Sequence, residues 1–254
     1  MASPSKEPRV SLDNTGRIYK RLNRSVGQAI HRYGMISHGD RIAVGLSGGI
    51  DSLFLMHILC ERLKRIPIHY ELTAIHIDPG FEGGFSDSLT AYCGEMGYEL
   101  RIEHTDHGVR AHGRENRKNP CFLCSRLRRK RLFELTAEMG CSKLALGHHR
   151  DDIIETFFLN VCYAGEISTM VPSQSMFDGE IVVIRPLAFA DEHLIRRFGK
   201  AAGFPQFDNP CPSAASSKRR EIKDLLSQLY RGNDKIKGNI FRALSRPKID
   251  YLLK

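Results

Sequence analysis

Apolar and polar residues along the chain follow two spacings, and each spacing predicts a different kind of element. Alternating apolar positions, as in Ile42, Val44 and Leu46, are typical of a strand. Apolar positions three and four residues apart, as in the run after Ser52, are typical of a helix. Together the spacings predict strands at 41–46, 71–78, 98–104, 143–147 and 180–186. They predict helices at 17–37, 53–64, 86–96, 124–140, 148–163 and 191–202, and in the tail from about 217.

Strands and helices alternate along most of the chain, and this order predicts an α/β fold. Because strand–helix–strand units favour parallel pairing, we expect a doubly wound, mainly parallel, five-stranded sheet with helical additions at both ends. Such sheets bind ligands beyond the carboxyl ends of their strands. Ser47, Asp78 and His104 follow or end the first three strands, so we expect them at one edge of the sheet.

Shifts in composition divide the chain into three parts. Residues 1–38 form an arm and a basic helix, residues 39–205 form the sheet domain, and residues 206–254 carry Cys211 and a basic tail. Two polar stretches that contain glycine, Thr105–Asn119 and 165–179, are expected to be surface loops.

Basic residues outnumber acidic ones by 38 to 29, which gives a net charge of +9. The excess is concentrated at 17–32, 126–131, 196–197 and 218–220. A polyanionic partner explains these clusters, and solvated helix faces explain them about equally well. No apolar run approaches the roughly 20 residues of a membrane span, and the N-terminus has no signal-peptide pattern, so we expect a cytoplasmic protein with no membrane partner.

The stretch Ser47-Gly48-Gly49-Ile50-Asp51-Ser52 connects the first strand to its helix. Its glycines allow a tight turn and a close approach to a ligand, and the helix N-terminus offers unpaired N–H groups. The stretch therefore predicts a phosphate site. It has neither the Lys-Ser/Thr pair of a Walker A loop nor the third glycine of a dinucleotide fingerprint. The alternative is a capped strand–helix turn without a ligand.

Two adjacent carboxylates, Asp151 and Asp152, follow the strand at 143–147 and begin the next helix. Asp is a favoured N-cap residue, so one reading is purely structural. The other reading is a Mg²⁺ site, because Mg²⁺ prefers carboxylate and phosphate oxygens. Gly147, just before them, suits a close backbone approach to a nucleotide.

The chain has seven cysteines, of which four are expected to be buried apolar residues: Cys60, Cys93, Cys141 and Cys162. Cys121 and Cys124 form a C-x-x-C motif beside several arginines, which we expect to lower the pKa values of the two thiols. With Cys211 they offer three thiolates, and the residues leave three readings open. These are a [4Fe–4S] cluster with one open iron, a zinc site completed by His107 or His112, and a redox dithiol with Cys211 incidental.

Several motifs occur in an order that resembles one family. Ser47–Ser52 resembles the pyrophosphate (PP) loop of the ATP-pyrophosphatase superfamily, whose members cut ATP between the α and β phosphates. The further motifs are PCxxCSRLRR at 120–129, ALGHHRDD at 145–152, MVP at 170–172, VIRPL at 183–187 and PCP at 210–212. Together they resemble the tRNA 2-thiocytidine synthetase family of PP-loop sulfurtransferases, from about residue 20 to about residue 230.

The resemblance implies an ATP-dependent reaction on tRNA. The oxygen on C2 of a cytidine, at position 32 of the anticodon loop, would attack the α-phosphate, and sulfur carried by a [4Fe–4S] cluster would then displace AMP. A sulfur donor, either a cysteine desulfurase or free sulfide, is an implied partner, and a homodimer is a further hypothesis. The residues that this implies are the nucleotide and Mg²⁺ site Ser47, Gly48, Gly49, Asp51, Ser52, Asp78 and Gly147, the catalytic group Asp51, Arg128, Asp151 and Asp152, and the cluster ligands Cys121, Cys124 and Cys211.

The chain departs from the family pattern at Ile50, where the family usually has Lys, and at Ala214, where a second late Cys is common. The stretch Thr105–Asn119 matches no family pattern. Two other hypotheses follow. One keeps the chemistry and changes the target to a uridine or a small molecule, and the other is a zinc- and nucleotide-binding RNA adaptor without turnover.

Overall fold

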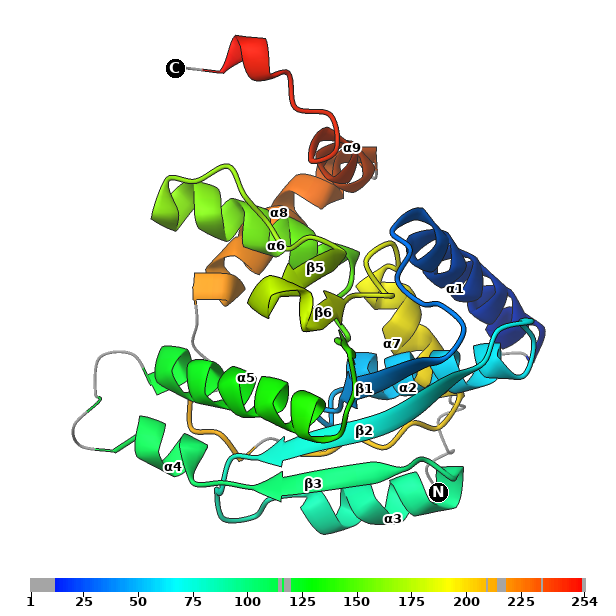
Figure 1. Cartoon of the computed structure of the whole chain (residues 1–254). Coiled ribbons are helices and arrows are strands. Elements are labelled where there is room, and N and C mark those ends of the chain that lie inside the picture. The colour runs from blue at the N-terminus through cyan, green and yellow to red at the C-terminus, as the bar shows by residue number, and fades with distance from the viewer. Residues whose placement is uncertain are drawn as a thin grey trace, which may run out of the picture.

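The chain folds around a six-stranded sheet that carries helices on both faces (Figure 1). The computed structural model describes residues 12–113, 116, 120–208, 210–213, 218–233 and 235–252. The departure at Ala214 and residues 1–11 of the expected arm lie outside the described residues. The helix expected at 17–37 is α1, Leu12–Arg32, so it begins and ends earlier than the sequence indicated.

The strands lie in the order β3-β2-β1-β4-β6-β5. Neighbours from β3 to β6 pair in parallel, and β5 pairs antiparallel with β6. Their bounds are β1 Asp40–Gly45, β2 Tyr70–Asp78, β3 Leu100–His104, β4 Lys143–Ala145, β5 Ser173–Met176 and β6 Ile181–Ile184. The parallel register brings the ends of β1, β2 and β3 to one edge, as predicted.

The prediction of five strands was wrong, because β5 lies inside the stretch 165–179 that was expected to be a loop. Its sequence, Ser-Gln-Ser-Met, has no apolar run that would indicate a strand. It forms an edge strand because a tight turn at Phe177–Gly179 folds it back on β6, with positive φ at Phe177, Asp178 and Gly179. The turn contains an Asp-Gly pair, Asp178-Gly179, which is a usual hairpin signal, but no alternating apolar residues precede it to indicate a strand.

Helices cover the sheet in two layers. The described helices of more than one turn are α1, α2 Ile50–Leu63, α3 Ser86–Met96, α4 His107–Ala111, α5 Pro120–Glu138, α6 Arg150–Leu159, α7 Glu192–Ala201, α8 Lys218–Gly232 and α9 Lys235–Ala243. In β1, Ile42 and Val44 face a core built with α1, α2, α3 and α7, whereas Ala43 faces a smaller core built with α5. The alternation of the strand therefore divides the apolar residues between the two layers.

The stretch Thr105–Asn119 was expected to be a loop, but its first part contains the short helix α4. Tertiary contacts hold α4 in place: Gly108 N–H donates to Pro79 O at 2.8 Å, and a Cβ at Gly108 would lie 2.5 Å from the Phe81 ring. No apolar spacing encodes such contacts. The next helix, α5, begins at Pro120 and not at Cys124, since Pro is favoured in the first turn of a helix.

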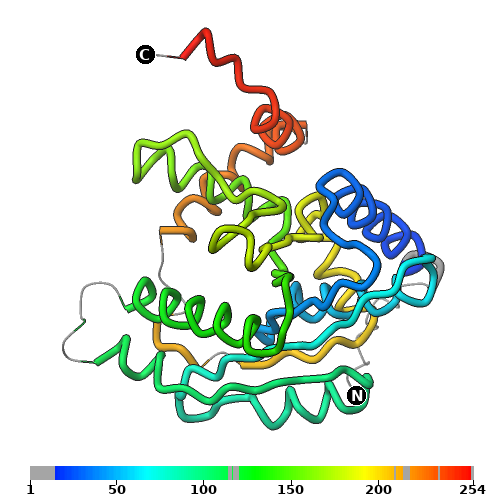
Figure 2. The backbone as a smooth tube through the Cα atoms, viewed as in Figure 1, coloured from blue at the N-terminus to red at the C-terminus, as the bar shows by residue number. Residues whose placement is uncertain are grey.

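The C-terminal helices pack on α6, where Ile154 lies in a third small core with Ile222 and Leu226 of α8. Figure 2 shows the chain after α7 running back along the sheet toward the start of α5 before α8 begins. This return brings Phe207 and Pro210 close to the carboxyl edge of β1 and β2. In the described residues, no helix is both long and apolar enough to span a lipid bilayer.

Candidate active site

The loop between β1 and α2 is held by its own serines. The Ser47 N–H donates to Ser52 Oγ at 3.1 Å, and the Ser52 hydroxyl donates to Gly49 O at 2.8 Å. The Gly49 N–H donates to Ser47 Oγ at 3.3 Å. Gly48 has φ +80°, and a Cβ there would lie 2.5 Å from the Phe85 ring, so only glycine fits this position.

The N-terminus of α2 is open toward the loop. Gly49 is the N-cap residue, and no described side chain caps the first turn, so its N–H groups remain available to an anion. The Ile50 side chain packs on α7, because its Cδ1 would lie 2.6 Å from a Cβ at Gly199. The departure from Lys at position 50 is therefore used as an apolar contact between helices.

A cavity of about 240 Å³ lies in front of this loop. Five parts of the chain meet there: the loop, the end of β2, the residues just before α3, α5, and the return segment after α7. Of the predicted site residues, the cavity is lined by Ser47, Gly48, Gly49, Asp78 and Arg128, together with Pro210, the neighbour of Cys211.

Asp78 is held as a carboxylate at the rim of the cavity. The Ser86 hydroxyl donates to Asp78 Oδ2 at 2.5 Å, the Gly80 N–H donates to Oδ1 at 2.9 Å, and His104 Nδ1 lies 3.5 Å from Oδ2. Burial raises the pKa of Asp78, but the two hydrogen bonds and His104 outweigh burial, so the pKa lies below its ordinary value. Asp78 is thus an acceptor for ligand hydroxyl or amino groups.

Three residues of this cavity were not singled out from the sequence. His76 is buried in β2, its Nδ1 lies 2.8 Å from Leu46 O, and burial lowers its pKa. Phe85 and Phe207 stack with ring centroids 5.0 Å apart and an interplanar angle of 19°. The sequence signal for His76 was a polar residue inside an apolar strand. The stacking of Phe85 on Phe207, which are far apart in the chain, has no sequence signal.

Asp51, in the first turn of α2, faces His149, whose Nε2 lies 3.8 Å from Asp51 Oδ1. Asp51 Oδ1 is buried without a hydrogen-bond partner among the described residues, and burial raises the pKa of Asp51 above its ordinary value. Gly147 packs against the backbone of α2, since a Cβ there would lie 3.1 Å from Asp51 C and Ser52 N. The predicted close approach of Gly147 is thus to the loop's own helix.

Neither Asp151 nor Asp152 is the N-cap residue of α6, although the sequence indicated that role. His149 is the N-cap of α6, and Asp152 completes a capping box by accepting from the His149 N–H at 3.0 Å. Asp151 turns toward α7 and α9, where Oδ2 accepts from the Glu192 N–H at 3.0 Å and Oδ1 is paired with Lys237. Asp152 also acts electrostatically on Asp51 of α2, whereas Asp151 joins the C-terminal helices to α6.

The cysteines divide as the sequence suggested, with one exception. Cys93 and Cys141 are buried and Cys60 is half-buried, but Cys162 is exposed in the π-helical turn Asn160–Ala164 that continues α6. Cys121 is exposed, and Cys124 and Cys211 are half-buried.

The Cys124 thiol interacts electrostatically with Arg128 and also with Cys211 and Cys121. Burial raises the pKa of Cys124 and outweighs Arg128, so the expected lowering was wrong for this thiol. Across the described residues, no three His, Cys, Asp or Glu side chains are already arranged tightly enough to hold a metal ion.

Two contacts hold the Cys211 segment at this edge of the sheet. Phe207 stacks on Phe85, and His112 Nε2 lies 2.9 Å from Ser213 Oγ. The other ring nitrogen of His112 lies 2.9 Å from Gly108 O, so both nitrogens are engaged within the protein. His112 thus positions the Cys211 segment, and α4, which the sequence did not predict, is the base for this contact.

The site combines a glycine-rich loop at a helix N-terminus with a fixed carboxylate on the next strand. Both lie on the carboxyl edge of a doubly wound sheet, and this combination defines an ATP-binding domain of the PP-loop class. The PP-loop domain family model matches residues 18–228. The tRNA-cytidine(32) 2-sulfurtransferase of Geobacter sulfurreducens is 40% identical over 238 residues, which cover 92% of this chain and 93% of that protein. The enzyme of the same name from Photorhabdus laumondii is 43% identical over 85% of this chain and 71% of that protein. The chain belongs to the tRNA-cytidine(32) 2-sulfurtransferase family of PP-loop proteins.

Solved structures agree with this assignment. The U34-tRNA thiolase NcsA from Methanococcus maripaludis, solved with its [4Fe–4S] cluster, superposes with a TM-score of 0.77 at 27% identity, over 94% of this chain and 81% of that chain. An NH3-dependent NAD synthetase from Campylobacter jejuni has a TM-score of 0.50 at 13% identity over 93% of this chain and 94% of that chain, which is a likeness of fold alone.

Proposed function

We propose that this protein is an ATP-dependent tRNA sulfurtransferase that replaces the oxygen on C2 of cytidine 32 with sulfur. The observation that carries the proposal is one shared cavity, lined by the Ser47–Gly49 loop, by Arg128 from the Cys-x-x-Cys helix and by Pro210 beside Cys211. A nucleotide-activating loop beside two segments that carry thiols is an arrangement that suits a sulfur transfer. Relatives about 40% identical are named for this reaction.

The loop and the start of α2 bind the ATP phosphates in this proposal. The N–H groups near Gly49 and Ile50 are the donors, and α2 adds its positive dipole end, while the hydroxyls of Ser47 and Ser52 hold the loop in shape by donating to Ser52 Oγ and Gly49 O. Asp51 is the first proposed Mg²⁺ ligand, because its buried Oδ1 has no hydrogen-bond partner among the described residues. Asp152 is the second, and Asp151 supports the site by holding the start of α6 against α7 and α9.

Cys121, Cys124 and Cys211 are the proposed cluster ligands. Three thiols fit a [4Fe–4S] cluster with one open iron, and the electrostatic coupling of Cys124 to the other two supports the set. A cluster spreads its ligands over different irons, so the thiols need not converge on one point as they would around zinc. When bound, the cluster would supply sulfur as sulfide, so replacing the oxygen requires no net oxidation of the tRNA.

The chain's own residues then favour adenylation of the base. The C2 oxygen attacks the α-phosphorus and pyrophosphate leaves, and Arg128 lies where it neutralises charge that develops on the phosphate. A sulfur nucleophile forms the C2–S bond as the C–O bond breaks and AMP leaves. Asp78, held as a carboxylate, accepts hydrogen bonds from the nucleotide.

The partners are proposals of the same kind. They are tRNA, a sulfur donor that is either a cysteine desulfurase or free sulfide, and a second copy of the chain in a homodimer. Cytoplasmic location follows from the tRNA substrate.

The test is nucleoside mass spectrometry after incubating the anaerobically prepared protein with ATP, Mg²⁺, sulfide and a tRNA transcript. We expect 2-thiocytidine with a transcript carrying C32, and no thiolated product from a matched transcript carrying U32 or without ATP. Thiolated uridine would shift the target to that of the U34 thiolases. No thiolated nucleoside with any transcript would overturn the proposal and favour the adaptor.

A further inference from the structure

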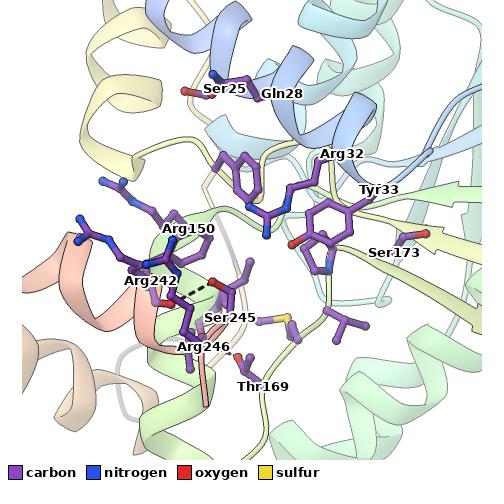
Figure 3. A pocket seen from close by; sticks show the side chains of 18 residues that line it. Ser25, Gln28, Arg32, Tyr33, Arg150, Thr169, Ser173, Arg242, Ser245 and Arg246 are labelled. Carbon is purple, nitrogen blue, oxygen red and sulfur yellow. Dashed lines mark hydrogen bonds between the residues drawn. The ribbon is translucent and has the colours of Figure 1, made fainter. Parts of the chain in front are cut away.

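A second, larger cavity lies between α1, α6 and α9 and has no part in the chemistry described above. Its volume is about 920 Å³, within the usual range for ligand pockets. Figure 3 shows Arg32, the last residue of α1, and the following Tyr33 on one side of it and Arg150, Arg242 and Arg246 on the other.

One wall of this cavity is the MVP motif at 170–172, which the ATP site does not use. The motif is fixed by Arg185 from the VIRPL motif: Arg185 Nη1 donates to Val171 O at 2.5 Å, and the Arg185 N–H donates to Pro172 O at 2.8 Å. Thr169 Oγ1 donates to Ile153 O at 2.5 Å and ties the same wall to α6. Two of the sequence motifs therefore build this cavity.

The lining combines cations with aromatic rings. Four arginines line it, and its described lining residues include no Asp or Glu. Arg32 lies 5.7 Å from the ring centroid of Tyr33 and 5.9 Å from that of Phe189, and Arg150 lies 5.9 Å from that of Phe241. Guanidinium groups beside ring faces are how proteins bind unpaired nucleotides, since bases stack on the rings and phosphates pair with the arginines.

The two arginines of the C-terminal part are held in position by ion pairs elsewhere on α9. Lys237 is paired with Asp151 and lies 2.9 Å from Asp191 Oδ1, which fixes α9 against α6 and α7. Arg150 is itself paired with Asp191. By contrast, neither Arg242 nor Arg246 has a carboxylate partner in the described part of the chain, so both charges remain available for a ligand.

The cavity also lies close to the ATP site along the chain. Arg150 lines it, and the preceding residue, His149, faces Asp51 at the start of α2. The start of α6 therefore separates the two sites. We propose that this cavity binds unpaired nucleotides of the same tRNA that flank the target base, with the bases near Tyr33 and Phe189 and the phosphates near Arg32, Arg242 and Arg246. This inference rests on the proposed function, because it needs a tRNA substrate.

The first test measures the affinity of the whole protein for tRNA over a range of salt concentrations. R242A/R246A is expected to weaken binding roughly tenfold and to reduce the slope of log K against log [salt] by about 1.4, two phosphate contacts at about 0.7 each. The matched control is K200A, since Lys200 is an exposed cation in the last turn of α7 and lines neither cavity. K200A should leave the tRNA affinity close to that of the wild type and should change the slope by less than about 0.7, the value for one phosphate contact. The ATP affinity should be unchanged in all variants.

The second test does not depend on a variant. Ultraviolet cross-linking of the wild-type protein to tRNA, read by peptide mass spectrometry, should place nucleotides on peptides that contain Tyr33 or Phe189. An equal tRNA affinity and slope for R242A/R246A, K200A and wild type would overturn the inference, and so would cross-links confined to α5. Inorganic phosphate could also compete with tRNA for the wild type but not for R242A/R246A, with no cross-link to Tyr33 or Phe189. That result would mark a simple anion site and would also overturn the inference. If wild-type protein does not bind tRNA, the proposed function itself fails.

Discussion

At the scale of single residues, the ATP site depends on positions where a side chain is impossible or a polar atom is left unpaired. Gly48 has positive φ and faces the Phe85 ring, and Asp51 has a buried oxygen without a described hydrogen-bond partner. Features of this kind cost stability in the empty protein and are typical of binding sites. They support the proposal that the loop is a binding turn and not an ordinary strand–helix connection.

Gly48→Ala should therefore impair ATP binding more than it impairs folding. Positive φ costs a residue with a Cβ about 1–2 kcal/mol, and the added methyl would also push Phe85 away. We expect ATP affinity to fall at least about tenfold, which corresponds to 1.4 kcal/mol. Gly94→Ala in α3, where a Cβ would meet nothing within 4 Å, is the control and should bind ATP normally. Equal calorimetric affinities for the two variants would contradict this reading of the loop.

The sequence predicted these residues because they are contiguous and carry a known chemistry. Ser47, Gly48 and Gly49 could be assigned from six letters, and Arg128 could be assigned from its motif. His76 and Phe207 could not, because their roles come from rings and strands that meet only in the folded chain. The pKa of Cys124 was predicted in the wrong direction, since burial is a tertiary property that neighbouring arginines in sequence do not reveal.

At the scale of elements, the sheet positions the glycine-rich loop and the return segment positions Cys211. The strands with apolar alternation were predicted, and the parallel order followed from their alternation with helices. β5 and α4 were missed, because each is held by tertiary contacts and has no periodic pattern of its own. The missed helix α4 matters for function, since it supports the contact between His112 and Ser213 next to Cys211.

Phe207→Ala should loosen that segment. The stack with Phe85 contributes about 0.5–1.5 kcal/mol beyond apolar burial, so we expect a modest loss of global stability but a much faster loss of iron from the anaerobic protein. Phe177→Ala is the control, because Phe177 contacts Phe133 at the β5–β6 turn, on another part of the sheet. Time courses of iron release should differ several-fold between the variants. Identical release would mean that Phe207 does not anchor the segment.

At the scale of the whole molecule, the net charge of +9 overstates the surface available to RNA. The basic cluster at 218–220 is largely engaged within the protein: Lys218 pairs with Glu221, Arg219 with Glu155, and Arg220 with Asp224. Arg126 and Arg129 of α5 are exposed, and neither has an ion-pair partner among the described residues. Clusters that look alike in sequence therefore differ in what they offer a polyanion.

Salt-dependent tRNA binding separates the two clusters. R126A/R129A should lower the slope of log K against log [salt] by about 1.4 to 2, because both charges are free to contact phosphates. The triple variant K218A/R219A/R220A should change the slope by less than about 1 and should instead lower the thermal stability. A larger loss of slope in the triple variant than in R126A/R129A would contradict the assignment of free and paired charges.

The proposed sulfur transfer depends most on Cys211, which would join Cys121 and Cys124 in one cluster beside the ATP loop. The most direct measurement is iron and acid-labile sulfide per chain in anaerobically isolated Cys211→Ala, taken together with its ATP affinity. Cys162→Ala is the control, because Cys162 is exposed on the π-helical turn after α6. We predict that Cys211→Ala loses the iron and sulfide that wild type and Cys162→Ala retain, while all three proteins bind ATP equally well. Full iron and sulfide in Cys211→Ala would contradict the account.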